Sequence, residues 1–128
     1  MEKFSIIIPV YNEGKNLKIL IPKIYGELKK IKFELIIIDD NSTDNTVKIL
    51  KKFKQKNFHH IIREEERDLS KSCVLGFKKS RYKNIIVMDG DLQHKPSDIK
   101  KFLHIFYKNS PDIIVGSRDL FKDKKHNL

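Results

Sequence analysis

The stretch Ile85-Ile86-Val87-Met88-Asp89-Gly90-Asp91 joins an apolar run, typical of a buried β-strand, to two acidic residues that stand one residue apart. Residues i and i+2 of an extended segment face the same side, so both carboxylates can bind one hard cation. A divalent ion bound in this way usually also binds substrate phosphates. The stretch therefore indicates a strand end that binds a metal and a phosphate-bearing substrate. The alternative is a solvated loop, because Asp-x-Asp also occurs often by chance.

Apolar runs that read as strands alternate with amphipathic stretches that read as helices along the whole chain. The expected strands are Phe4 to Val10, Leu35 to Ile38, Phe58 to Ile62, Asn84 to Met88 and Ile113 to Val115. The expected helices are one capped by Asn12, one that starts after the polar turn Asn41 to Asp44, and those over Ser70 to Ser80 and Pro96 to Tyr107. This order predicts an α/β fold, an open and mostly parallel sheet with helices on both faces.

Length, charge and cysteine usage narrow the possible classes of protein. The 128 residues suffice for one domain with a real core, and no apolar run approaches membrane-spanning length, so we expect a cytoplasmic protein. The net charge of +10 attracts anions, but the excess is mostly Lys without interleaved aromatic residues, and nucleic-acid binding is not expected. The single cysteine, Cys73, has helical spacing with Leu69, Val74 and Phe77, which predicts that these residues share the buried face of a helix. Cys73 is therefore interpreted as a small buried residue and is assigned no chemistry.

Polar residues follow several of the expected strands. In open parallel sheets, ligands bind beyond the carboxyl ends of the strands, at the point where the strand order reverses. The polar strand ends are Pro9-Val10-Tyr11-Asn12-Glu13, Asp39-Asp40, Asp89-Gly90-Asp91 and Gly116-Ser117-Arg118. The chain has neither a glycine-rich dinucleotide turn nor a Walker-type lysine loop, so a metal and Arg118 are expected to hold the phosphates.

Four motifs in this order resemble the signatures of family 2 glycosyltransferases with the GT-A fold, and the resemblance covers almost the whole chain. The motifs are Pro9 to Glu13, Ile38 to Thr46, Met88 to His94 and Val115 to Arg118. Within that family, Arg67-Asp68-Leu69-Ser70, Val74-Leu75-Gly76-Phe77 and the Gln-His pair after Asp91 are most similar to polyprenol-phosphate (dolichol-phosphate) mannosyl- and glucosyltransferases. Two residues depart from that subgroup: Gly90 stands where Ala is usual, and Asp68 stands where Gly is usual.

The resemblance implies a role for each strand-end residue. Pro9, Tyr11, Glu13 and Asp40 would contact the base and ribose of the donor nucleotide. Asp89 would lie near the ribose and the metal, and Asp91 and Gln93 would be metal ligands, with Mg²⁺ or Mn²⁺ as the ion. Arg118 would bind donor or acceptor phosphate, and Asp91 and Arg118 are the expected catalytic residues. Plainer interpretations exist: Glu13 as a first-turn acid of a helix, and Arg118 as a solvated arginine.

The implied reaction is the metal-dependent, inverting transfer of a hexose, mannose or glucose, from a GDP- or UDP-sugar to a polyprenol phosphate. The acceptor phosphate is already anionic near neutral pH, so no strong general base is required. In the resembling enzymes an acceptor loop, further arginines and any membrane helices follow the point where this chain stops. Residues 1–128 are therefore interpreted as the nucleotide-sugar-binding part of a GT-A domain, with a partner chain as a source of membrane helices. The basic tail Lys122 to His126 suggests a peripheral position at the cytoplasmic face of the membrane.

Other functions stay open. One is a nucleotide-sugar-binding fragment without turnover, and another is a family 2 enzyme that glycosylates a hydroxyl of a cell-surface glycan. A receiver-type signalling domain is disfavoured, because its acidic pair should follow the first strand and a lysine should follow the fifth. A phosphatase built on Asp-x-Asp is disfavoured too, since its nucleophile should follow the first strand.

Overall fold

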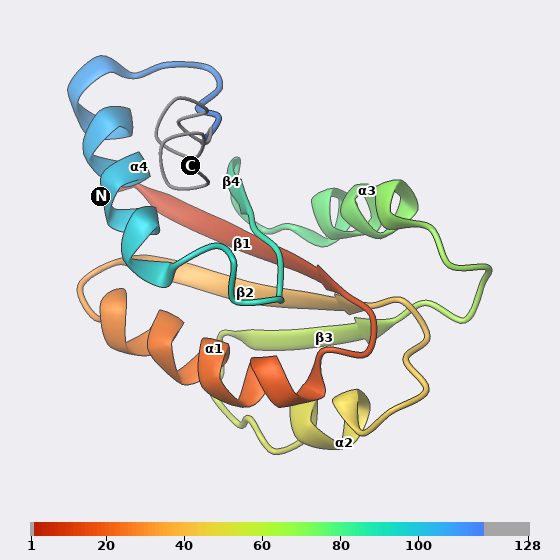
Figure 1. Cartoon of the computed structure of the whole chain (residues 1–128). Helices are drawn as coiled ribbons and strands as arrows, with labels where there is room; N and C mark the ends of the chain where they lie inside the picture. The colour runs from red at the N-terminus through yellow and green to blue at the C-terminus, as the bar shows by residue number, and fades with distance from the viewer. Residues whose placement is uncertain (1, 117–128) are drawn as a thin grey trace, which may run out of the picture.

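The structure is a computed structural model that describes residues 2–116 of the chain. Strands and helices alternate along it (Figure 1). The elements are β1 (Lys3–Val10), α1 (Gly14–Glu27), β2 (Lys32–Asp39), α2 (Thr46–Leu50), β3 (Phe58–Ile62), α3 (Leu69–Lys79), β4 (Asn84–Val87) and α4 (Pro96–Asn109). None of the helices within residues 2–116 is long and apolar enough to cross a membrane.

The four strands form one parallel sheet in the order β3-β2-β1-β4. β1 lies between β2 and β4, with Phe4 paired to Phe33 on one side and to Asn84 on the other. The strand order therefore reverses between β1 and β4, which are neighbours in space and far apart in sequence. Ligands of open parallel sheets bind at such a reversal, so the loops that follow β1 and β4 are the place to look for a site.

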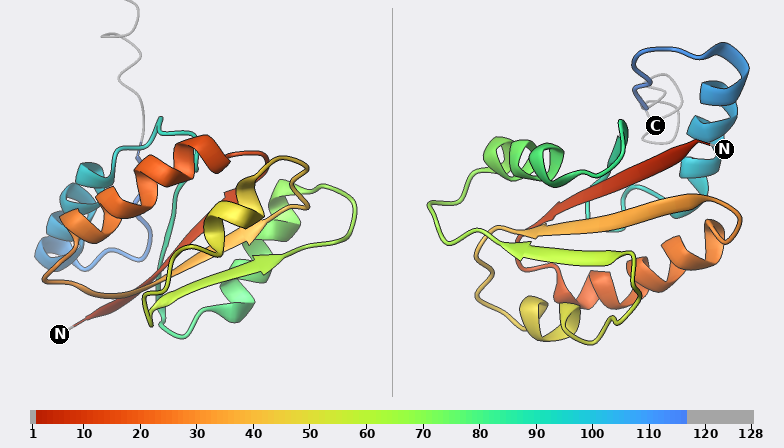
Figure 2. Two further views of the ribbon diagram at one scale, coloured as in Figure 1. Left: turned by 90° about the horizontal axis from the view of Figure 1, so that it is seen from below. Right: turned by 180° about the vertical axis from the view of Figure 1, so that it is seen from behind.

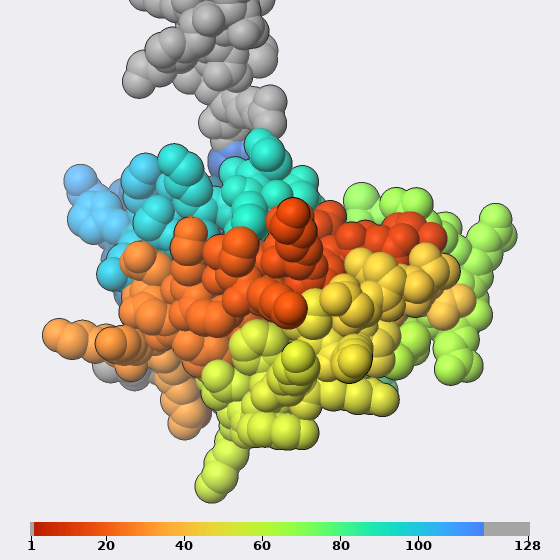
Figure 3. All heavy atoms as spheres, turned by 60° about the horizontal axis from the view of Figure 1, so that its bottom comes forward, coloured from red at the N-terminus to blue at the C-terminus, as the bar shows by residue number. Residues whose placement is uncertain are grey.

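Helices cover both faces of the sheet, as the two views of Figure 2 show. The larger core lies on one face, where Ile6 and Ile8 of β1 meet residues of α1 and α4. The smaller core lies on the other face, where Ile7 and its neighbours in β2 pack against Leu75 of α3. In the space-filling view of Figure 3, α1 (orange) and α2 (yellow) lie side by side over the first face. The predicted α/β fold with a parallel sheet and helices on both faces is confirmed.

The central strands are apolar on both faces because both faces are covered. Ile6, Ile7 and Ile8 are all 0 % exposed, although successive side chains of a strand point in opposite directions. This explains why the strands read as continuous apolar runs in the sequence. The predicted and observed bounds of β3 coincide, and those of β1, α3 and β4 differ by one residue at each end at most. β2 begins at Lys32, three residues before the predicted Leu35.

Two sequence-based expectations about secondary structure are wrong. Residues Ile113 to Val115 do not form a fifth strand: Ile113 and Val115 are each 79 % exposed and pair with no neighbouring strand in the described part of the chain. A three-residue run has little β-structure of its own without a hydrogen-bonded partner. Asn12 does not cap α1 either, because the N-cap is Glu13, and Asn12 adopts a left-handed conformation (φ 53°).

The inward face of α3 also differs from the prediction. Leu69, Val74 and Phe77 are 63 %, 45 % and 44 % exposed, and Cys73 is only partly buried. Ser72 and Gly76 are the buried residues of α3 instead. A Cβ atom on Gly76 would lie 2.5 Å from Cγ2 of Ile7, so α3 packs closely on β1 through its small residues.

Gly76 and Gly26 offer a matched test of this close packing. A Cβ atom on Gly26, which lies in the last turn of α1, would meet nothing within 4 Å. We expect Gly26→Ala to raise the free energy of unfolding by up to about 1 kcal/mol, the gain in helix propensity. Gly76→Ala brings the same gain but overpacks the interface with Ile7, so its free energy of unfolding should be about 1–3 kcal/mol below that of Gly26→Ala. Urea unfolding of both variants measures the difference, and equal stabilities would contradict the packing of α3.

Candidate functional site

A pocket of about 190 Å³ opens at the carboxyl ends of the strands, beside the reversal between β1 and β4. Its lining residues are Pro9, Val10, Tyr11, Glu13, Asp40, Arg67, Leu69, Ser72, Asp89, Gly90 and Asp91. The structure thus brings together the predicted site residues that follow β1, β2 and β4. Gln93 does not line this pocket but contacts Asp91, and Arg118 lies outside the described residues.

Asn12 joins the loop after β1 to the loop after β2. Its side-chain Oδ1 accepts hydrogen bonds from the backbone N–H groups of Thr43 (2.8 Å) and Asp44 (3.2 Å). The backbone N–H of Asn12 donates to Oγ of Ser42 at 2.8 Å. The left-handed conformation of Asn12 is therefore stabilised by contacts between the loops, which fix the neighbouring Tyr11 and Glu13 in the pocket wall.

The two aspartates at the end of β2 have different surroundings. Asp39 is 0 % exposed, and its carboxylate accepts hydrogen bonds from the backbone N–H and the hydroxyl of Ser42, so it stabilises the turn. Asp40 lines the pocket but is only 4 % exposed. One Asp40 oxygen accepts from Nη1 of Arg63, and the other accepts from the backbone N–H of Asp68 at 2.7 Å.

Sequence reasoning missed Arg63, which lies directly after β3 and is 7 % exposed. Besides Asp40, its Nη1 approaches the backbone carbonyls of Glu66 and Asp68, each at 3.4 Å. Asp40 and Arg63 therefore hold the segment 63–68 against the end of β2. The scarcity of arginine in a Lys-rich chain was the available signal, since a guanidinium is the usual cation of a buried ion pair.

The loop after β4 folds back on itself. The backbone N–H of Asp89 donates to Nδ1 of His94 at 3.0 Å, and the backbone N–H of Gln93 donates to Oδ1 of Asp91 at 3.0 Å. Leu92 between them has a φ of 67°, a conformation that is unusual for a leucine and fits a tight turn. The carboxylates of Asp89 and Asp91 stay exposed at the pocket.

A family model described as "Glycosyl transferase family 2" matches residues 5–128. The chain belongs to this family. It is 37 % identical over 126 residues to a dolichol-phosphate mannosyltransferase of Pyrococcus furiosus, covering 98 % of this chain and 36 % of that protein. The chain spans less than half of the length of this relative. The family match confirms the resemblance to family 2 glycosyltransferases that the sequence motifs indicated.

Solved structures share the fold. The chain superposes on residues 1–349 of S. aureus TarS with a TM-score of 0.73 and 21 % identity, covering 94 % of this chain and 40 % of that one. The same TarS fragment has also been solved in complex with UDP. The mannosyltransferase PcManGT of Pyrobaculum calidifontis, in complex with GDP-Man and Mn²⁺, has a TM-score of 0.61 and 19 % identity, covering 69 % of this chain and 27 % of that one. These likenesses confirm a GT-A-like fold for this family 2 chain.

The residues at the pocket fit a hard divalent cation that is held only in part by protein. No group of three or more His, Cys, Asp or Glu side chains within residues 2–116 could hold a metal by itself. The carboxylates of Asp89 and Asp91 are oxygen donors, as is the side-chain amide of Gln93. Mg²⁺ in phosphate-binding enzymes usually takes one or two carboxylates and completes its shell with substrate phosphates and water. Such a donor set suits a hard divalent ion whose remaining ligands come from phosphate and water.

Gly90, where the polyprenol-phosphate subgroup usually has Ala, has a local explanation. Gly90 is buried, and a Cβ atom on it would lie 2.9 Å from Cγ1 of Val10. The valine at position 10 therefore leaves little room for an alanine at position 90. Asp68, the other departure, accepts a hydrogen bond from the backbone N–H of Lys71 at 3.0 Å and so caps α3.

Cys73 is no candidate nucleophile in this glycosyltransferase chain. Burial, followed by the negative charge of Asp89, raises the pKa of the Cys73 thiol. A thiol with a raised pKa is largely protonated at neutral pH, and the thiolate is the nucleophilic form. The prediction that Cys73 carries no chemistry therefore agrees with its surroundings.

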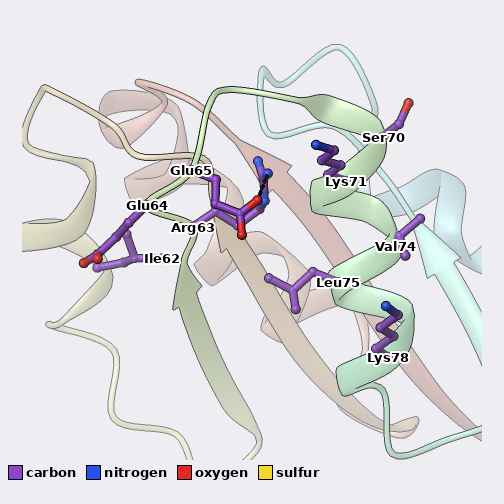
Figure 4. Close-up of a pocket in the computed structure, with 9 residues that line it drawn as sticks. All are labelled: Ile62, Arg63, Glu64, Glu65, Ser70, Lys71, Val74, Leu75 and Lys78. Carbon is purple, nitrogen blue, oxygen red and sulfur yellow. Dashed lines mark hydrogen bonds and ion pairs between the residues drawn. The ribbon is translucent and has the colours of Figure 1, made fainter.

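A larger hollow of about 560 Å³ lies between the end of β3 and α3 (Figure 4). Its lining residues are Ile62, Arg63, Glu64, Glu65, Ser70, Lys71, Val74, Leu75 and Lys78. None of the predicted site residues lines it. Arg63, Glu64 and Glu65 line it from the segment after β3, and Lys71 and Lys78 line it from α3. The smaller pocket is therefore the better candidate for the chemistry of a family 2 glycosyltransferase.

Proposed function

We propose that this chain is the nucleotide-sugar-binding part of a metal-dependent glycosyltransferase that moves mannose or glucose from a GDP- or UDP-sugar to a polyprenol phosphate. The observation that carries the proposal is the meeting of the loops after β1, β2 and β4 in one acidic pocket. The name of the P. furiosus relative supports the lipid-phosphate acceptor, and the PcManGT complex with GDP-Man and Mn²⁺ supports a nucleotide sugar and a divalent ion.

In this proposal the predicted site residues bind different parts of the donor. Pro9, Tyr11 and Glu13 bind the base and ribose from the β1 side. Asp89, Asp91 and Gln93 hold the metal, and Arg118 binds a phosphate. When bound, the ion supplies positive charge that stabilises the leaving diphosphate.

The proposal gives Asp40 a second task. Both Asp40 oxygens already accept hydrogen bonds from Arg63 and Asp68. Each carboxylate oxygen has two lone pairs, so a further bond to a nucleotide is compatible with these contacts. Asp40 thus binds the nucleotide and orders the segment 63–68 at the same time.

A second candidate is binding of the nucleotide sugar without turnover by this chain alone. The observation that favours it is that the predicted site residues which line the pocket are all assigned to the donor nucleotide or its metal. Correct orientation of two substrates can lower a barrier by about 7–11 kcal/mol, and an acceptor site is needed for that effect. In this case a partner chain or further segment would complete the acceptor site at the membrane surface.

Thermal unfolding with UDP, GDP and their sugars, each with and without Mn²⁺, tests the proposal. We expect one nucleotide series to stabilise the protein by about 2.7 kcal/mol at a hundredfold excess over its Kd, and only when the metal is present. Stabilisation by none of them would contradict a donor-binding role. Transfer of labelled sugar from the binding donor to polyprenol phosphate then separates the two candidates, because the binding fragment gives the thermal shift without product.

A further inference from the structure

Arg67 is part of the pocket wall although it does not belong to the loops after β1, β2 or β4. It lies in the segment between β3 and α3, and its guanidinium carbon is 4.0 Å from the centroid of the Tyr11 ring. The other charged residues that line the pocket are Glu13, Asp40, Asp89 and Asp91. Arg67 is therefore the only basic side chain in this wall, as far as the described residues 2–116 show.

Local charge does not explain where the Arg67 side chain lies. Glu64, Glu65 and Glu66 precede it directly, yet within the described part of the chain Arg67 forms neither an ion pair nor a side-chain hydrogen bond. Glu65 lies instead 3.5 Å from Nη2 of Arg63. An exposed cation–π contact such as the one with Tyr11 contributes little and leaves the N–H groups of the guanidinium available to a ligand.

The backbone on both sides of Arg67 is anchored. Arg63 is fixed by its buried ion pair with Asp40, and the backbone N–H of Asp68 donates to the same carboxylate. Asp68 in turn caps α3. Arg67 is thus presented to the pocket from a segment that is held at both ends, which lowers the entropy that is lost when its side chain binds a ligand.

We propose that Arg67 binds the diphosphate of the donor nucleotide, an inference that rests on the proposed function. The carboxylates of Asp89 and Asp91 balance the two charges of a divalent ion, so an anionic diphosphate needs cationic side chains from the protein in this acidic pocket. Arg118, assigned to a phosphate above, lies outside the described residues. A guanidinium can donate two parallel hydrogen bonds to a phosphate. Arg67 is the residue of the pocket wall that has this chemistry.

Calorimetry with three ligands of one base tests this role. Wild type and Arg67→Gln are titrated with the nucleoside diphosphate, the monophosphate and the nucleoside, in the presence of Mn²⁺. The base is guanine or uracil, whichever stabilises the wild type. We expect Arg67→Gln to weaken diphosphate binding about tenfold or more and nucleoside binding less than twofold. Arg67→Lys should lie between, because it keeps the charge and loses the planar pair of donors.

Arg81→Gln is the matched control, since it removes an exposed positive charge from a residue that does not line the pocket. Its diphosphate affinity should stay within about twofold of wild type. Equal losses for the nucleoside and the diphosphate in Arg67→Gln would place Arg67 at the base and overturn the assignment, as would an unchanged affinity for both. A wild type that binds none of the three ligands contradicts the proposed function itself, so the two failures are distinguishable.

Discussion

Asp91→Asn is expected to weaken Mn²⁺-dependent nucleotide binding by more than about 100-fold. Loss of a residue that only supports a metal ligand typically costs 10- to 100-fold in metal affinity, so loss of a direct carboxylate ligand should cost at least as much. An asparagine keeps the Oδ1 atom that accepts the backbone N–H of Gln93. The turn of the loop can therefore persist, and the loss reports on the charge. Calorimetric titration of wild type and Asp91→Asn with the nucleotide, with and without Mn²⁺, measures this loss of affinity.

Asp112→Asn provides the control for this substitution. Asp112 is exposed and does not line the pocket, so the same change in charge should leave the affinity within about twofold of wild type. Equal nucleotide affinity with and without divalent ions in the wild type would rule out the metal. Unchanged metal-dependent binding in Asp91→Asn would remove Asp91 from the set of ligands.

Arg63→Met is expected to lower the free energy of unfolding by about 3–5 kcal/mol. Both side chains of the Arg63–Asp40 pair are 6 % exposed, and removal of one partner leaves the other charge buried and unpaired. The methionine keeps an apolar stem of similar length, so most of the loss comes from the unpaired Asp40. Urea unfolding measures the effect, and a loss below about 0.5 kcal/mol would show that the pair does not hold the segment 63–68.

Two further variants sharpen this test. Arg81→Met replaces an exposed arginine and should change the free energy of unfolding by no more than about 0.5 kcal/mol. In the Arg63→Met background, Asp40→Asn removes the unpaired charge and should restore part of the stability. Such a non-additive result is expected for two residues in direct contact.

The sequence predicted the strands well because of how they are buried. β1 and β2 are covered on both faces, so their apolar runs are long and their carboxyl ends are marked by the first polar residues. The start of β2 was missed because the buried Glu34 interrupts its apolar run. The inward face of α3 could not be predicted in the same way. Its contact with β1 depends on small residues, Ser72 and Gly76, whereas its larger apolar residues stay exposed. Side-chain size alone therefore pointed to the wrong face.

The candidate site, too, could be predicted from the sequence only in part. The residues after β1, β2 and β4 could be assembled from the sequence, because parallel strands of one sheet place their carboxyl ends at the same edge. The contacts of Arg63 and Arg67 could not be predicted from the sequence. Both lie after β3, and only the hydrogen bonds of Asp40 show how that segment folds back over the pocket.

By itself, the sequence determined the parallel α/β fold, the family resemblance and the acidic edge of the sheet, because these follow from local periodicity and from residues that are close in the chain. The tertiary structure decided which neighbours each polar group has. Asn12 binds the loop after β2 rather than capping α1, and Asp40 holds a segment more than twenty residues away. Hydrogen bonds of this kind depend on the positions of two loops at once, and no pattern within either loop specifies them.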